Sequence, residues 1–183
     1  MRWLWIICVV AVLAGVPARA SADQTDARLG GLFATLKTSE GVEAAVTERK
    51  IWAIWLETPD QNVQRLLEIG IAHMNGGANA QALKSFDEIV AIAPGFAEGW
   101  NKRATVHYLL GNFDASLADI EKTLALEPRH FGALSGRGLI YAKLEELEKA
   151  LAAFDAALEI HPNMTGAKTN AAIIRKVLKQ REI

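Results

Sequence analysis

Two histidines at matching positions are the residues of this sequence best placed to do chemistry. His73 and His107 lie 34 residues apart, and two imidazoles brought together by a repeating structure are potential metal ligands. Two imidazoles alone make a poor site, and no carboxylate stands at a spacing that completes it. Tyr141 follows at the same interval, so the pair is interpreted as replacing a core aromatic residue. A metal-dependent protein that uses both histidines is the alternative.

Other catalytic signatures are missing from the sequence. Cys8 is its single cysteine, which leaves no disulfide pair and no thiolate metal site. It contains no Gly-rich phosphate loop, no Gly-x-Ser-x-Gly elbow and no His-Glu-x-x-His run. His130 and His161 lie beside prolines, without a spacing that brings them to one helix face, and are expected on the surface. No enzymatic activity, cofactor or metal is predicted.

The charge of the chain argues against nucleic acid as a partner. Its 20 Lys and Arg against 21 Asp and Glu give a net charge of −1, with both signs mixed along the chain. Binding to a phosphate backbone needs clustered Lys and Arg. The 183 residues suffice for an ordinary domain without disulfides. A protein or peptide is therefore the expected partner.

The first twenty residues have the three parts of a secretory signal. Arg2 gives the positive start, and residues 3–16 form an apolar run, which is shorter than the roughly 18 residues that indicate a transmembrane helix. Ala18, Arg19 and Ala20 give the cleavage pattern. We expect a cleavable signal peptide over 1–20, cleavage after Ala20, export to the periplasm and no stable membrane span afterwards. An uncleaved signal that anchors the protein in the inner membrane is the alternative.

Three prolines at a constant interval organise the rest of the chain. Pro94, Pro128 and Pro162 are 34 residues apart, and a fixed period of this length is typical of a helical repeat. Before each proline, apolar residues recur at the spacing of one helix face: Leu83, Phe86 and Val90, then Leu117, Ile120 and Leu124, then Leu151, Phe154 and Leu158. The period divides 63–164 into repeats 63–96, 97–130 and 131–164, each expected to form two antiparallel helices.

Small residues mark close contacts and turns inside the repeats. One slot of the first helices holds Gly70, Ala104 and Gly138, where a close approach of two helices leaves no room for a larger side chain. Gly77 and Gly111 mark the turn to the second helix. The third repeat has Glu145 at this point, so its turn is expected to be made differently.

The repeat pattern resembles the tetratricopeptide repeat, which has small residues in its eighth and twentieth slots, aromatic residues in the eleventh and twenty-fourth, and proline in the thirty-second. The matching residues are Gly70, Ala82, Phe86 and Pro94 in the first repeat, Trp100, Ala104, Gly111 and Pro128 in the second, and Gly138, Tyr141, Ala150, Phe154, Ala157 and Pro162 in the third. This resemblance implies an all-α fold, a short right-handed α-solenoid of helix-turn-helix repeats.

Helical segments are expected on both sides of the repeats. Residues 21–62 are interpreted as an N-terminal helical pair, a degenerate repeat that caps the first true repeat with Trp52 and Trp55. The alternative is that the two tryptophans form an exposed docking patch. Residues 165–183 are expected to form a C-terminal capping helix, because solenoid ends need a lid with a polar outer face.

The resemblance also implies a binding groove lined by the first helix of each repeat. Its ligand-facing slots hold Leu67, Ile71, Met74 and Asn75, then Glu98, Asn101, Lys102, Thr105 and Tyr108, then Ser135, Leu139, Ala142 and Lys143. Family members that grip carboxylate tails have Lys and Asn where Leu67 and Ile71 stand, and cations where Gly132 and Gly136 stand. That ligand class is therefore rejected in favour of an apolar peptide or helix. The other interpretation is that the slots form a solvated surface and that binding occurs elsewhere.

The expected function is a non-catalytic periplasmic scaffold that binds a partner protein or peptide and supports assembly or integrity of the cell envelope. One alternative is an assembly helper for unfolded or extended clients, such as apocytochromes or outer-membrane precursors. An alternative of another class is an enzyme or metal-dependent protein without a recognisable site. A monomer is favoured.

Overall fold

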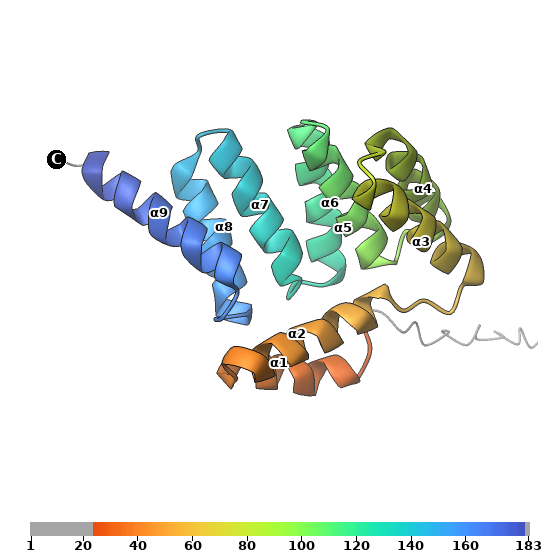
Figure 1. Cartoon of the computed structure of the whole chain (residues 1–183), viewed down its shortest axis with the longest axis horizontal. Coiled ribbons are helices and arrows are strands. Elements are labelled where there is room, and N and C mark those ends of the chain that lie inside the picture. Colours follow the sequence, from red (N-terminus) through yellow and green to blue (C-terminus); the bar gives the residue numbers. More distant parts are fainter. Residues whose placement is uncertain (1–23, 182–183) are drawn as a thin grey trace, which may run out of the picture.

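The computed structural model describes residues 24–181, and each regular element in that range is a helix (Figure 1). The helices are α1 (Arg28–Thr38), α2 (Gly41–Leu56), α3 (Gln61–Asn75), α4 (Asn79–Ile92), α5 (Ala97–Leu109), α6 (Phe113–Leu126), α7 (Phe131–Lys143), α8 (Leu147–Ile160) and α9 (Thr165–Arg181). This arrangement confirms the all-α prediction. The expected signal peptide over 1–20 lies outside the described residues. Between residues 24 and 181, no helix combines the length and the apolar character needed to cross a membrane.

The helices α3 to α8 form three antiparallel pairs that stack side by side, and α9 packs on the last pair (Figure 1). In the first and third pairs a phenylalanine ring of the second helix lies on a glycine of the first. A Cβ atom on Gly70 would lie 2.7 Å from the Phe86 ring, and one on Gly138 would lie 2.8 Å from the Phe154 ring. These glycines permit the close approach that the sequence predicts.

The middle pair solves the same packing problem with different residues. Ala104 occupies the small slot on α5, and the residue that takes the place of the ring on α6 is Ile120. Both are buried in one apolar cluster with Ala133 and Ile140 of α7. The exchange of a ring for a branched side chain on α6 matches the exchange of glycine for alanine on α5.

The turns between the paired helices have the same geometry in all three repeats. Gly77, Gly111 and Glu145 have φ angles of 74°, 76° and 61°. In each turn the amide of the following residue donates to a carbonyl of the preceding helix at 2.8 or 2.9 Å. The expectation that the third turn is made differently is therefore wrong. Glu145 adopts the left-handed conformation instead, at a cost of about 1–2 kcal/mol for a residue with a side chain.

The helices α1 and α2 form a hairpin that lies across the N-terminal ends of α5 and α7 and reaches α8 (Figure 1). Trp52 and Trp55 of α2 lie on Phe131, the first residue of α7, with ring centroids 5.5 and 5.1 Å away. The prediction that the two tryptophans cap the first repeat is therefore wrong. Leu56, at the end of α2, is the hairpin residue that packs against the core of α3 and α4.

Polar contacts hold the segment before the hairpin and the turn between α1 and α2, in addition to the apolar face of the hairpin. Gln24 donates to the carbonyl of Gly95 at 2.8 Å, before α5. At the other end, Asn163 donates to the carbonyl of Ser39 at 2.7 Å. The apolar face of the hairpin would be exposed alone, and Phe131 gives it an aromatic partner within one core cluster. This packing explains why the hairpin folds back over the repeats.

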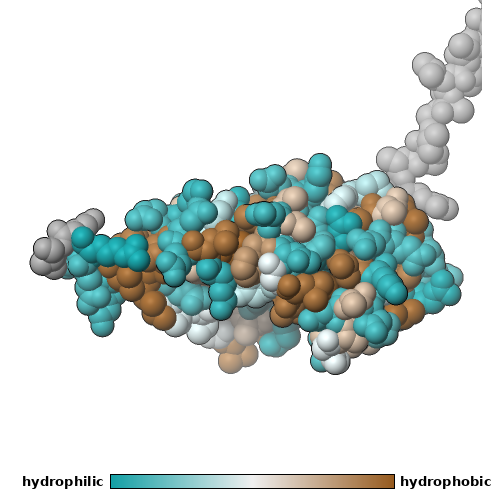
Figure 2. Space-filling model, turned by 90° about the horizontal axis from the view of Figure 1, so that it is seen from above, coloured by the Kyte–Doolittle hydropathy of each residue, from teal (hydrophilic) through white to brown (hydrophobic). Residues whose placement is uncertain are grey.

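The surface of the molecule mixes polar and apolar residues without a single dominant apolar patch in the view of Figure 2. Large apolar side chains are exposed at the C-terminal ends of α5 and α7, where Leu109 is 50% exposed, Leu110 41% and Leu144 39%. Single exposed apolar residues are normal on soluble proteins.

Candidate functional site

The predicted groove residues fall into two groups that differ in what covers them. The first group, Glu98 and Lys102, lies near the N-terminal ends of α5 and α7; together with Gly132 of α7, these residues are called the lower groove here. The second group surrounds a cavity between α5 and α7, called the inner pocket. The α1–α2 hairpin lies on the lower groove, and the inner pocket remains open.

Trp52 fits the lower groove because α7 has a glycine at the point of contact. A Cβ atom on Gly132 would lie 2.6 Å from Cη2 of Trp52, well inside the normal separation. The ammonium of Lys102 lies 5.3 Å from the centre of the Trp52 ring, within range of a cation–π interaction. The ring of Trp55 stacks on His130 with centroids 4.1 Å apart and planes 9° from parallel. The hairpin therefore occupies these slots with aromatic side chains.

A buried polar network lies beneath the two tryptophans. Nδ1 of His130 accepts from the amide of Ala133 at 3.1 Å, so the ring proton is on Nε2, which donates to Oε2 of Glu98 at 3.0 Å. Asn101 donates to the same oxygen at 3.0 Å, and the ammonium of Lys102 lies 2.8 Å from Oε1. Glu98 is 1% exposed and His130 0%. A buried carboxylate is tolerated where it is paired with a cation and accepts hydrogen bonds, as Glu98 does from His130 and Asn101 at Oε2 and with Lys102 at Oε1.

The pKa of Glu98 is lower than the ordinary value for a glutamate. Burial is the largest single influence and raises this pKa, but the charge of Lys102, followed by the hydrogen bond from His130 and further contributions from both residues, lowers it by more. Glu98 is therefore ionised near neutral pH and carries the charge that organises this network. It acts structurally, since Glu98 and His130 are almost completely buried.

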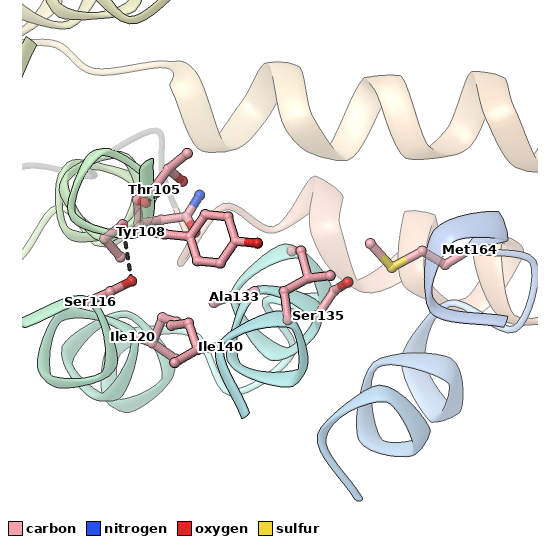
Figure 3. A pocket seen from close by; sticks show the side chains of 13 residues that line it. Thr105, Tyr108, Ser116, Ile120, Ala133, Ser135, Ile140 and Met164 are labelled. Atoms are coloured by element: carbon pink, nitrogen blue, oxygen red, sulfur yellow. Dashed lines mark hydrogen bonds between the residues drawn. The ribbon is translucent and has the colours of Figure 1, made fainter. Parts of the chain in front are cut away.

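The inner pocket is a cavity of about 200 Å³ between α5 and α7 (Figure 3). Its wall is mostly apolar, and the lining residues are Asn101, Ala104, Thr105, Tyr108, Ser116, Ile120, Gly132, Ala133, Ser135, Gly136, Leu139, Ile140 and Met164. Ser116 is satisfied inside the fold, because its hydroxyl donates to the carbonyl of Ala104 at 2.7 Å. Thr105 likewise donates to the carbonyl of Asn101 at 2.9 Å.

Two hydroxyl groups of the inner pocket are free to bind another molecule. Neither the Tyr108 nor the Ser135 hydroxyl makes a hydrogen bond with any residue in the described range 24–181. In Figure 3 both point into the space between α5, α7 and Met164. An apolar cavity with a few convergent polar groups is the usual form of a ligand pocket. Leu139, 36% exposed, stands at its edge.

The structure brings five of the thirteen predicted groove residues together at the inner pocket: Asn101, Thr105, Tyr108, Ser135 and Leu139. Glu98 and Lys102 lie under the hairpin instead. Asn75 and Lys143 are exposed and do not line the pocket.

The slots of the first repeat are mostly used for packing. Leu67 is only 1% exposed in the core cluster of α3 and α4, so its assignment to the ligand-facing surface is corrected. Ile71 and Met74 are half-buried against the same cluster. The apolar end that the sequence predicts for the groove is therefore largely core.

Sequence reasoning missed Met164, which closes one side of the inner pocket. Met164 is the last residue of the third repeat and stands directly before α9. Its signal in the sequence is its position, because the start of the capping helix continues the surface formed by the first helices. It also missed the burial of His130 and His161, which are 0% and 2% exposed although a surface location was expected. His161 lies 3.3 Å from a carboxylate oxygen of Glu48 on α2.

The histidines of the repeating slot do not assemble a metal centre in this structure. Nε2 of His107 lies 3.9 Å from a carboxylate oxygen of Asp119. In the part of the chain from residue 24 to residue 181, no group of three or more His, Cys, Asp or Glu side chains is arranged to hold a metal ion.

Comparison with known proteins identifies the repeat. The model of the tetratricopeptide repeat family matches residues 101–165. A TPR repeat-containing protein of Rhizobium etli is 35% identical over 122 residues, which are 66% of this chain and 60% of that relative. This chain thus matches less than two thirds of the length of that relative.

Solved structures show the same fold. The first TPR of Spaghetti (RPAP3) bound to the HSP90 peptide SRMEEVD has a TM-score of 0.63 at 24% identity, over 65% of this chain and 94% of that one. MamA has a TM-score of 0.62 at 21% identity, over 85% of this chain and 84% of that one. The TPR2B domain of yeast Sti1, in a complex with an Hsp70 peptide, has a TM-score of 0.60 at 20% identity, over 64% and 98%. Residues 101–165 thus match the tetratricopeptide repeat family, and the solved neighbours show that the chain has the tetratricopeptide repeat fold.

Proposed function

We propose that this protein is a non-catalytic interaction scaffold that binds a partner by inserting an apolar side chain of that partner into the inner pocket. The observation that carries the proposal is the open cavity between α5 and α7, with its apolar wall and two unpaired hydroxyl groups. Two of the solved neighbours hold peptides on the same fold, which supports a peptide or an extended segment as the ligand.

The chemistry of the inner pocket favours an apolar group over a charged one. Its wall is mostly apolar, and with two glycines on α7 no cation lines the cavity. A volume of about 200 Å³ suits one large aliphatic or aromatic side chain. The hydroxyl groups of Tyr108 and Ser135 would then bind the backbone or a polar end of the same residue, because a specific pocket pairs apolar burial with a few oriented polar contacts.

Because the lower groove is filled, the proposed ligand contacts a short stretch of the surface. A partner segment that follows the whole groove would collide with Trp52. One anchored side chain with limited flanking contact favours a defined partner over the broad capture of unfolded clients.

We further propose that the scaffold acts in the periplasm of a Gram-negative bacterium and supports assembly or integrity of the cell envelope. Arg2, the apolar run 3–16 and the pattern ending at Ala20 support export, and the Rhizobium etli relative fits a proteobacterial source. Fractionation of cells that produce the full chain, with N-terminal sequencing of the product, tests this cellular location. A periplasmic product that begins at Ser21 is expected, whereas a cytoplasmic product that retains residues 1–20 contradicts export.

The pocket is tested with one variant and one matched control. Leu139→Arg places a charge at the edge of the inner pocket, and Ile173→Arg makes the same exchange at a 56% exposed position of α9 that lines no described pocket. Proteins retained from a periplasmic extract by the native chain are identified, and the purified partner is titrated against all three chains. At least a tenfold loss for Leu139→Arg alone, about 1.4 kcal/mol, is expected.

The same titration decides between the candidate functions. Equal affinity for the native chain and Leu139→Arg would place the binding surface elsewhere. Retention of many unrelated proteins by native chain and variant alike would favour the helper that binds unfolded clients. Tyr108→Phe removes a single hydroxyl group, and a loss of about twofold to tenfold is expected if that group binds the ligand.

A further inference from the structure

An arginine recurs in the second and third repeats, but its carboxylate partner does not. Arg103 on α5 and Arg137 on α7 stand 34 residues apart, in the same slot. In the second repeat the opposing position on α6 holds Asp119, and in the third repeat the equivalent position on α8 holds Ala153. In this slot the second repeat therefore has a carboxylate opposite its arginine, and the third repeat has none.

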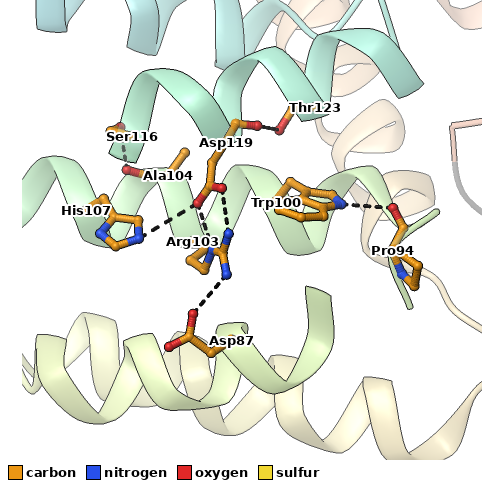
Figure 4. A network of polar contacts seen from close by, with 9 residues as sticks. All are labelled: Asp87, Pro94, Trp100, Arg103, Ala104, His107, Ser116, Asp119 and Thr123. Carbon is orange, nitrogen blue, oxygen red and sulfur yellow. Dashed lines mark hydrogen bonds and ion pairs between the residues drawn. The ribbon is translucent and has the colours of Figure 1, made fainter. Parts of the chain in front are cut away.

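The completed pair shows what this arginine slot can bind (Figure 4). Nε and Nη2 of Arg103 donate to the two carboxylate oxygens of Asp119 at 2.8 and 2.7 Å, which is the bidentate geometry that fits guanidinium to carboxylate. Nη1 donates to Asp87 of the preceding repeat at 2.9 Å. The Asp119 side chain is 4% exposed, so the pair is largely shielded from water.

In the third repeat the same place is a cavity. Arg137, Tyr141, Lys149, Ala152 and Ala153 line a pocket of about 220 Å³ on α7 and α8. Arg137 makes no hydrogen bond or ion pair with any residue from 24 to 181. The methyl group of Ala153 replaces the carboxylate of the preceding repeat and leaves the space in front of the guanidinium open.

The other charged groups near this pocket leave its net charge positive. Lys149 lies 5.4 Å from the centre of the Tyr141 ring and pairs with Glu146, a residue outside the lining. Glu121 stands where Asp87 stands one repeat earlier, yet it is exposed and makes no ion pair with any described residue. Two cations and a tyrosine hydroxyl therefore face a cavity whose described lining contains no carboxylate.

We propose that this pocket, formed by Arg137, Tyr141 and Lys149, binds a carboxylate group of another molecule in the position that Asp119 occupies in the preceding repeat. The planar guanidinium favours a two-oxygen acceptor, and the internal example of Arg103 favours carboxylate over other anions. The site shares no residue with the inner pocket. It is therefore a second contact point, independent of the proposed apolar ligand.

The proposal is tested on the full chain by NMR of the arginine Nε–Hε groups. The resonance of Arg103 serves as the internal reference for a bound carboxylate, and exposed Arg49 serves as the reference for non-specific binding. The probes are acetate, the side-chain carboxylate of N-acetyl-glutamate amide, the terminal carboxylate of N-acetyl-glycine, and inorganic phosphate, each at constant ionic strength. We expect the Arg137 signal to move in a saturable manner toward that of Arg103 with the carboxylates.

The different probes distinguish a side-chain carboxylate from a chain terminus, and both from binding that is not specific for carboxylate. A stronger response to the glutamate probe indicates a side chain of a partner, and a stronger response to the glycine probe indicates a chain terminus. The proposal is overturned if phosphate alone saturates the signal, or if Arg49 responds as Arg137 does. It is also overturned if Glu121→Gln shifts the Arg137 signal without any probe, because Glu121 would then already fill the site.

Two variants complete the test. Ala153→Asp supplies the missing carboxylate within the chain, so the Arg137 signal is expected near that of Arg103 from the start and insensitive to all probes. Arg137→Gln is expected to abolish the probe response of the Ala153 amide while leaving the helical circular dichroism unchanged. A probe response that survives in Arg137→Gln overturns the proposal even if Ala153→Asp fails to fold. Leu139→Arg changes the inner pocket and leaves the Arg137 site intact. Failure of the proposed carboxylate site can therefore be distinguished from failure of the proposed inner pocket.

Discussion

The lower groove and the inner pocket both lie on α5 and α7, yet the hairpin covers the lower groove and leaves the inner pocket open. On the lower groove, Trp52 and Trp55 cover Glu98 and His130 and remove them from solvent. A short distance further along α5 and α7, Tyr108 and Leu139 face open space. The difference shows that the segment outside the repeats decides which slots of a repeat surface are accessible.

The largest expected effect is the loss of Trp55, which is 2% exposed. Trp55→Ala should lower the free energy of unfolding by about 3–5 kcal/mol, because the cavity cannot close over the stacked His130 ring. Trp55→Phe keeps a ring and removes an indole N–H that has no hydrogen-bond partner within residues 24–181, so its loss should be much smaller. Urea denaturation measures both, and equal stability of the two variants would mean that the hairpin contributes little to the closed end.

Two glycines of α7 test the contrast between the closed lower groove and the open inner pocket. Gly132→Ala places a methyl group against the Trp52 ring and should destabilise the fold by about 1–3 kcal/mol through overpacking. Gly136→Ala meets only Ile120, at 3.7 Å, and should stabilise α7 by roughly 0.5–1 kcal/mol. Hydrogen exchange of α2 amides should increase in the first variant and not in the second. The same change in both would show that the hairpin does not rest on Gly132.

Acid should weaken the closed end selectively. The pKa of Glu98 is lower in the folded chain than its ordinary value of 4.5, so ionised Glu98 stabilises the fold above that pH. This contribution is lost as the pH falls through the lower folded value. The stability difference between the native chain and Glu98→Gln should therefore shrink from about pH 7 to about pH 3 in urea titrations. Exposed Glu43→Gln is the control, and a difference that does not change with pH would contradict the role of the charge.

The smallest expected effect concerns the turn after α7, near the open end. Glu145→Gly should raise the free energy of unfolding by roughly 0.5–1 kcal/mol, because the left-handed conformation at φ 61° no longer carries a side chain. Gly111→Ala makes the opposite exchange in the equivalent turn of the second repeat and should destabilise it. Thermal unfolding checks both, and a loss of stability in Glu145→Gly would show that its side chain contributes more than the strained backbone costs.

The parts of the fold that repeat were predictable from the sequence. The proline interval and the small slot of Gly70, Ala104 and Gly138 indicated paired helices, because a regular period places equivalent residues in equivalent contacts. The contact of Phe86 with Gly70 is such a case. The structure of a repeat can be predicted from sequence because equivalent residues in several copies support the same contact.

The hairpin was not predictable in the same way, because it occurs once. Its apolar face, with Trp52 and Trp55, needed a partner, but periodicity does not say that this partner is Phe131 and not the first repeat. The burial of His130 followed from that docking and was missed for the same reason. For the candidate site, the slot pattern named Tyr108 and Leu139, whereas the closure of Glu98 depended on a long-range contact.

The short connection between α2 and α3, residues 57–60, has a consequence for any competitor of the hairpin. A segment tethered this closely is present at its docking surface at an effective concentration of millimolar order. A free molecule that binds the same slots with the same intrinsic affinity displaces Trp52 only when its concentration exceeds this effective concentration. A ligand that enters the inner pocket faces no such competition, so two ligands of equal intrinsic affinity would bind this protein with very different apparent strength.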